Sequence, residues 1–185
     1  MTLGGLGAPG CAAQALRVHS RSIRPVPNLV CVLCTLTVSA TPSAVSFTLI
    51  KGGVATGSAP VVITTTMNGV SLLASLKLYG YFSSAATALA DGRPTPDKIP
   101  SSAVLGQMTT GVPTSYTAFT QTNALGTAGA SLLLFNTSSL LSLGCLPAVA
   151  VCRTDSLNLR IDLTTLPLLP AGTYTGTLIL QAQAL

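Results

Sequence analysis

Two alternating stretches near the end of the sequence constrain the fold more than any other feature. In residues 157–163, Leu and Ile alternate with polar residues, and residues 173–184 again separate into two alternating sets. A period of two predicts β-strands with one buried face, because successive side chains of a strand point to opposite sides. A link marked by Pro and Gly, residues 167–172, separates the stretches. We therefore expect an antiparallel pair of strands.

The second stretch begins at a predicted corner. Tyr174 lies just after Gly172 and shares a face of the strand with Leu178 and Leu180, opposite Thr177. A buried tyrosine ring whose hydroxyl bonds to nearby backbone would fix such a corner. We therefore predict that Gly172 and Tyr174 are structural corner residues and that Leu178 and Leu180 belong to the core.

Composition extends the β prediction to the rest of the chain. Only 7% of the residues are charged, against about 25% in an average domain, and the sequence has no Glu. Long charged helix formers are scarce, whereas Thr and Val favour strands, and 17 Gly and 12 Pro favour turns. The sequence predicts an all-β fold, an immunoglobulin-like antiparallel β-sandwich of roughly eight short strands. The expected strands before the final pair cover residues 45–49, 60–67, 72–82, 103–109, 115–120 and 130–135.

Residues 1–40 differ in character from the remainder. A small basic run, residues 17–24, precedes an apolar or small uncharged run, residues 29–40, that ends in Val38-Ser39-Ala40. This order is typical of a secretory signal. We expect residues 1–40 to be a leader or a disordered extension and residues 41–185 to form the sandwich. The alternative is that residues 35–40 are its first strand. The apolar run is shorter than about 18 residues, so no stable transmembrane segment is expected.

The charged residues argue against several classes of function. The formal net charge is +5, but no basic cluster of the kind that follows phosphates is visible, so nucleic-acid binding is not expected. The sole histidine, His19, lies in the predicted leader, which leaves the mature domain without a His-dependent triad or metal site. We interpret the four acidic residues as solvated surface charges. They are Asp91, Asp97, Asp155 and Asp162. We expect no enzyme activity, catalytic residue, metal or cofactor.

Two of the five cysteines are candidates for a disulfide. Cys145 and Cys152 lie in or beside a short loop ahead of the final strand pair, and such a loop can close in an oxidising compartment. Two free buried thiols are the alternative. Cys31 and Cys34 lie in the apolar run and lack the context of a redox or zinc motif. No role is predicted for Cys11.

Both ends of the predicted sandwich resemble a known group of proteins. The segment LPAGTYTGTLILQAQAL, residues 169–185, and the segment CTLTVSATPSAVSF, residues 34–47, are similar to the last and first strands of bacterial secreted sandwich proteins of the spore coat protein U and chaperone–usher pilin type. Those families often pair an early cysteine with one in the next strand. Residues 60–70 contain none, so Cys34 has no obvious partner there.

This resemblance implies a protein that is secreted, periplasmic or on the cell surface. It implies a structural or surface protein, a subunit of a coat or pilus-like assembly that associates with itself or with other surface proteins. Such subunits polymerise by donating a strand to a neighbour's open groove. The alternative is a surface-displayed immunoglobulin-like module that binds a ligand or partner without polymerising.

Overall fold

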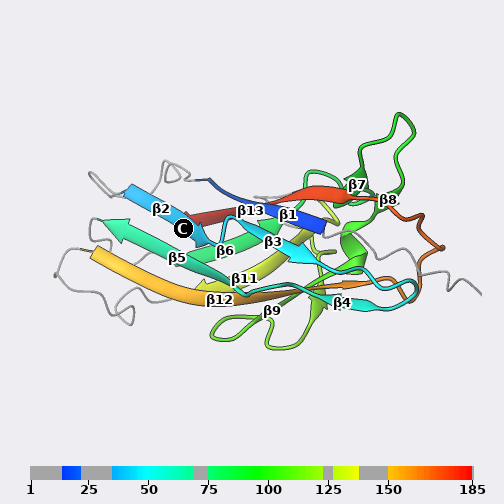
Figure 1. Cartoon of the computed structure of the whole chain (residues 1–185). Coiled ribbons are helices and arrows are strands. Elements are labelled where there is room, and N and C mark those ends of the chain that lie inside the picture. Colours follow the sequence, from blue (N-terminus) through cyan, green and yellow to red (C-terminus); the bar gives the residue numbers. More distant parts are fainter. Residues whose placement is uncertain (1–13, 22–34, 69–74, 123–126, 138–149, 185) are drawn as a thin grey trace, which may run out of the picture.

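Two β-sheets packed face to face across an apolar core make up the fold (Figure 1). The structure is a computed structural model that describes residues 14–21, 35–68, 75–122, 127–137 and 150–184. The predicted all-β sandwich is thereby confirmed. Within these residues, no helix is long and apolar enough to cross a membrane.

One sheet, here called sheet A, has seven strands. They are β1 (Gln14–Arg21), β3 (Ala44–Phe47), β6 (Leu76–Tyr81), β7 (Leu89–Asp91), β8 (Lys98–Ile99), β11 (Ser131–Thr137) and β13 (Tyr174–Ala184). Its main order is β11-β6-β13-β1-β3, and the β7–β8 hairpin attaches to the beginning of β13.

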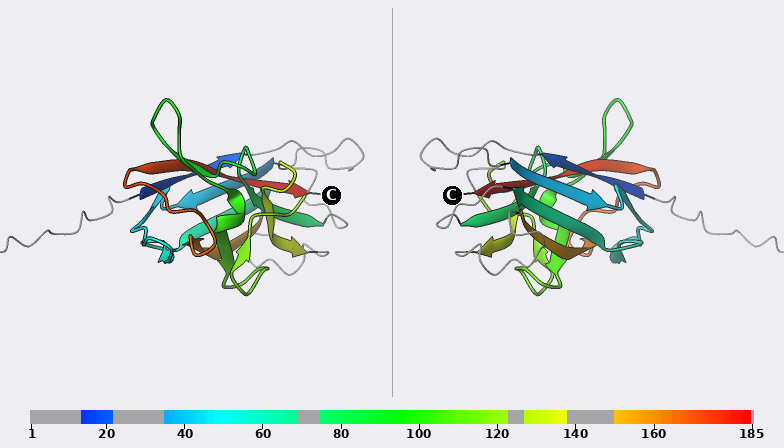
Figure 2. Two further views of the ribbon diagram at one scale, coloured as in Figure 1. Left: turned by 90° about the vertical axis from the view of Figure 1, so that its right-hand side faces the viewer. Right: turned by 90° about the vertical axis from the view of Figure 1, so that its left-hand side faces the viewer.

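The other sheet, sheet B, has six strands. They are β2 (Thr35–Thr41), β4 (Val54–Thr56), β5 (Val61–Asn68), β9 (Val104–Met108), β10 (Thr117–Ala118) and β12 (Ala150–Asp162). Its main order is β10-β9-β12-β5-β2, with β4 pairing the end of β12. A short 3₁₀ turn, η1 (Ser101–Ala103), leads into β9. Figure 2 shows the two layers from both ends of the molecule.

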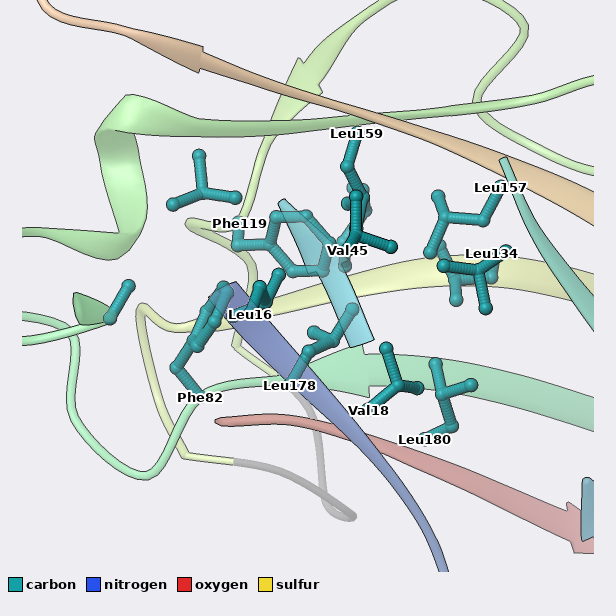
Figure 3. Close-up of a cluster of buried hydrophobic side chains, with 14 of the residues drawn as sticks. Leu16, Val18, Val45, Phe82, Phe119, Leu134, Leu157, Leu159, Leu178 and Leu180 are labelled. Carbon is teal, nitrogen blue, oxygen red and sulfur yellow. The ribbon is translucent and has the colours of Figure 1, made fainter. Parts of the chain in front are cut away.

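The core forms where alternating side chains of both sheets meet (Figure 3). In β6 the alternate residues Leu76, Leu78 and Gly80 are buried, and Phe82 follows them into the core. The rings of Phe82 and Phe119 meet edge to face, with centroids 5.2 Å apart. An edge-to-face contact stabilises the fold in addition to the stabilisation that burial of the two rings provides.

The last two long strands do not pair with each other, so the predicted hairpin is wrong. β12 pairs with β4, β5 and β9 of sheet B, whereas β13 pairs with β1, β6 and β7 of sheet A. The link between them is long enough to cross the core from one sheet to the other. Leu163, at its start, is buried and donates its N–H to the carbonyl of Gly53 at 2.9 Å, which anchors the link at the sandwich's edge.

The sandwich begins earlier in the chain than residue 41. Residues 14–21 form β1 in sheet A, and residues 35–41 form β2 in sheet B. Leu36 and Val38 of β2 point into the core and are 6% and 8% exposed. The expected boundary at residue 41 is therefore wrong for the fold, and the alternative reading of residues 35–40 as a strand agrees with β2. Removal of residues 1–40 on export stays a prediction.

The described residues form thirteen strands, whereas about eight were expected for the chain. The difference comes from β1 and from several strands of only two to four residues. Short pieces such as β4, β7, β8 and β10 pair locally along loops. Hydrophobic alternation needs more residues than these pieces contain, and so it does not predict them.

Candidate assembly site between β3 and β13

The first strand of the sandwich fills a position between two others. β1 pairs in parallel with β13 over seven residue pairs, from Ala15 opposite Thr175 to Arg21 opposite Gln181. On its other side it pairs antiparallel with β3 over four residue pairs. In Figure 1, β1 (dark blue) lies between β13 and β3. The first strand that the structure describes is thus inserted beside the last one.

Two apolar side chains of β1 close this part of the core. Leu16 is fully buried and Val18 is 7% exposed. Both point toward the buried residues Leu178, Leu180 and Val45 of the adjoining strands (Figure 3). Fully burying such a side chain contributes about 1.5–3 kcal/mol. Arg17 and His19, which alternate with these residues, are exposed on the outside of sheet A.

The pairing of β1 with β13 differs in direction from the other strand pairings that the structure describes. All other pairings among the described residues are antiparallel, and only β1 with β13 is parallel. A parallel neighbour cannot be joined by a tight hairpin. The pairing of β1 with β13 therefore does not come from a hairpin.

Without β1, two strand edges would face an open position. The backbone N–H and C=O groups of β13 and β3 that now pair with β1 need partners, because buried, unpaired backbone groups are costly. Leu178 and Val45 would also lose apolar cover. An extended strand supplies both the backbone partners and the apolar cover. The position therefore suits an alternating strand with apolar residues at the Leu16 and Val18 sites.

The sequence contained a signal for β1 that the leader interpretation hid. Leu16 and Val18 alternate with Arg17 and His19, which is the period of a half-buried strand. A basic segment before an apolar run is also typical of a leader. Sequence patterns alone do not separate the two, since they share the same residues.

The beginning of β13 is held by the corner that the sequence indicated. Tyr174 is 1% exposed, and its hydroxyl donates a hydrogen bond to the carbonyl oxygen of Pro170 at 3.1 Å. Gly172 is half-buried beside it. Burial raises the pKa of Tyr174 above its ordinary value, and the nearby carboxylates of Asp97 and Asp91 raise it further.

A small charged network from the β7–β8 hairpin adjoins this corner. Asp91 is 6% exposed and its Oδ2 lies 2.8 Å from Nε of Arg93. Its Oδ1 accepts a hydrogen bond from the backbone N–H of Asp97 at 2.9 Å. The interpretation of Asp91 as a solvated surface charge is wrong, because the hairpin folds back and encloses this carboxylate.

Asp155 is also buried, at 2% exposure, and so its surface interpretation is wrong too. It lies on the core face of β12, where Arg153 binds both carboxylate oxygens, at 2.6 and 2.7 Å. Thr110 donates its hydroxyl to the same carboxylate, and its carbonyl oxygen accepts from Arg153. The guanidinium of Arg153 lies 3.9 Å from the centroid of the Phe135 ring. These contacts make a structural ion pair that ties β12 to the loop after β9.

The other two carboxylates lie nearer to solvent. Asp97 is half-exposed and lies 3.5 Å from Arg93. Asp162 accepts hydrogen bonds from the hydroxyl and the backbone N–H of Thr164, at 2.5 and 2.9 Å, and these lower its pKa. Within the described residues, no three His, Cys, Asp or Glu side chains gather in a way that could hold a metal ion.

Of the predicted disulfide partners, only Cys152 lies in the described part of the chain. Cys152, in β12, is in the disulfide-bonded form. Cys145 lies outside the described residues, as do Cys11, Cys31 and Cys34. The pairing of Cys145 with Cys152 therefore stays a prediction.

Comparison with known proteins assigns this chain to no family. No family model matches the sequence, and no curated protein matches it. The functional argument therefore rests on the residues and the geometry described above.

Proposed function

We propose that this chain is an exported structural protein, a subunit of a coat or pilus-like assembly, in which the strand at the β1 position passes between neighbouring subunits. One observation carries the proposal. Strand β1 completes the core between β3 and β13 and runs parallel to β13. No hairpin among the described residues holds it there. The same strand from a neighbouring molecule fits the same position.

The surface and the buried charges support a structural role. Charged residues are 7% of the sequence, and the two buried carboxylates, Asp91 and Asp155, are each engaged by an arginine. Both carboxylates are buried, and their oxygens are already bound by neighbouring groups, so neither is presented to a substrate. The proposal accordingly includes no catalytic step, no cofactor and no nucleic acid.

A second candidate is a surface-displayed binding module that does not polymerise. The observation in its favour is that β1 of the same chain already fills the position between β3 and β13. A module completed by its own strand has no open groove to offer. The two candidates differ in one measurable property, which is whether the strand is exchanged.

Strand exchange can be tested with a chain whose own β1 is disabled. The variant carries Leu16→Lys and Val18→Lys, and a synthetic peptide of residues 14–21 is added in trans. We expect the variant to have a lower thermal midpoint, and the peptide to restore most of the loss. A control peptide with Ser at the Leu16 and Val18 sites should restore none, because it supplies backbone pairing without apolar cover.

The assembly itself is read from the size and morphology of the wild-type protein. Filaments or large oligomers that the Leu16 and Val18 double variant fails to form would support the structural proposal. A wild-type chain that stays monomeric at its highest soluble concentration would favour the binding module. Assembly that is unchanged in the double variant would contradict strand exchange.

A further inference from the structure

Among the residues that the structure describes, nothing covers the outer edge of β2 along Thr37–Thr41. β2 pairs with β5 on one side, from Thr35 opposite Asn68 to Thr41 opposite Val62. Within the described residues, no strand pairs with the other side of Thr37–Thr41, and no backbone hydrogen bond reaches it from a loop. The right-hand view of Figure 2 shows β2 (light blue) beside β5.

The other edges of the two sheets are covered or very short. The free side of β3 is closed by the bridge from Phe47 to Gly57, and the free side of β11 by a hydrogen bond from Val112 and a bridge to Gln121. The edge strand β10 has only two residues. Edge strands commonly carry charged residues or proline, or are covered by another segment. Their unpaired backbone groups could otherwise pair with a strand of another molecule. The segment Thr37–Thr41 carries no charge, and proline follows only at Pro42.

The side chains at this edge suit a second copy of the same strand. In a two-fold antiparallel pair centred on Ser39, that residue faces its own copy and Thr37 faces Thr41. Hydroxyl side chains then oppose hydroxyl side chains on the outer face, where all three are exposed. On the inner face Val38 opposes Ala40. Matched cross-strand pairs of this kind favour pairing by about 0.2–1 kcal/mol each.

The core beneath this edge is also incompletely covered. Val38 of β2 and Val18 of β1 retain 8% and 7% exposure, whereas Ile63 of β5, one strand further in, has none. A strand added at the edge would cover the exposed part of Val38. No charged residue within Thr37–Thr41 would oppose a like charge in the second copy.

We infer that two copies of this chain associate edge to edge through residues Thr37–Thr41 of β2, paired antiparallel about Ser39, which joins their B sheets into one. Five residues of pairing bury much less than the roughly 1,200–2,000 Å² of a stable interface. The isolated pair is therefore weak and concentration-dependent, and it gains strength when subunits are held close together in an assembly. This interface is separate from strand exchange at β1 and does not require it.

The test compares two lysine substitutions in the same row of sheet B. Ser39, Thr64 and Thr154 lie side by side across β2, β5 and β12. Ser39→Lys places a charge at the edge, and Thr154→Lys places the same charge on the same face, away from the edge; both side chains are exposed. Sedimentation equilibrium of the full chain, produced without export so that β2 is retained, measures the dimerisation constant.

We expect the wild type and Thr154→Lys to dimerise alike, and Ser39→Lys to dimerise at least about tenfold more weakly, because like charges would meet at the two-fold axis. Hydrogen exchange supplies a second readout, since the amides of Thr37–Thr41 should become protected as the wild-type concentration rises. A monomeric wild type at all concentrations would overturn the inference. So would equal weakening by both substitutions, which would indicate association through the sheet face.

The dimerisation measurement on the lysine variants is also independent of the peptide experiment on β1. The double variant at Leu16 and Val18 leaves Thr37–Thr41 intact, and Ser39→Lys leaves the β1 position intact. Rescue by the peptide together with unchanged dimerisation of Ser39→Lys would support strand exchange and reject the edge interface. The opposite pair of results would do the reverse.

Discussion

At the scale of single residues, the two faces of β13 should differ sharply in their contribution to stability. Leu178 is fully buried, whereas Thr177 is exposed on the outside of sheet A. Leu178→Ala should cost about 2–5 kcal/mol because it leaves a cavity. Thr177→Ala should change the free energy of unfolding by about 0.5 kcal/mol or less. Denaturant midpoints measure both. Equal losses would mean that a partner covers the outer face.

The ring and the hydroxyl of Tyr174 should make separate contributions to the free energy of unfolding. Tyr174→Phe removes the hydrogen bond to Pro170 and should cost about 0.5–1.5 kcal/mol. Tyr174→Ala also removes the buried ring and should cost more, about 3–5 kcal/mol by analogy with other large aromatic truncations. Urea midpoints at neutral pH separate the two effects. If Tyr174→Phe were as damaging as Tyr174→Ala, the packing account of the corner would be wrong.

The raised pKa of Tyr174 adds a dependence on pH with a definite sign. Below the ordinary value of 10.0, both the folded and the unfolded chain hold the proton, and the stabilisation is complete. Above 10.0 the unfolded chain loses the proton first, so the free energy of unfolding falls as the pH rises through the folded pKa. Tyr174→Phe should therefore lose less stability than the wild type between neutral pH and pH values above 10.0. Parallel curves for the two proteins would contradict this.

At the scale of elements, the close approach of the β7–β8 hairpin to β13 depends on one glycine. A methyl group at Gly176 would collide with the carbonyl oxygen of Ala88, whereas one at Gly92 would meet nothing within 4 Å. Gly176→Ala should therefore cost about 1–3 kcal/mol, because the hairpin must move. Gly92→Ala is the matched control and should lie within about 0.5 kcal/mol of the wild type. Equal urea midpoints would show that the hairpin adjusts freely.

The elements also show which features the sequence can predict. The inward faces of β6 and β13 follow from alternation alone, and Tyr174 follows from its place beside Gly172 at the start of a strand. Pairing between strands does not follow, because alternation identifies a buried face but not the neighbour across the backbone. For this reason the sequence predicts that β12 and β13 pair with each other. In the structure they lie in opposite sheets. The burial of Asp91 and Asp155 depends on arginines that the fold brings to them, and no spacing in the sequence indicates it.

At the scale of the whole molecule, the N-terminal boundary decides which strands the sandwich keeps. Cleavage near Ala40 would remove β1 and nearly all of β2, together with four core residues, Leu16, Val18, Leu36 and Val38. The sequence pattern predicts export with loss of residues 1 to about 40, but subunits cleaved there carry no β1 to donate. Exchange of β1 between subunits therefore requires that these residues are kept. Cell fractionation with N-terminal sequencing and intact mass tests this. Secreted protein that retains Met1 would contradict the leader and would leave the sandwich complete in itself.

The parallel arrangement of β1 and β13 gives the molecule a direction. Both strands run the same way, so Gln14 lies at the pole where β13 begins and Ala184 lies at the opposite pole. At about 3.3 Å per residue, the 11 residues of β13 separate the poles by roughly 36 Å. Two copies fused in tandem would therefore need a linker as long as the sandwich to lie side by side, but almost none to follow one another. Proteins fused before Gln14 and after Ala184 would be displayed on opposite ends of each unit, which gives any row of such units a distinguishable front and back.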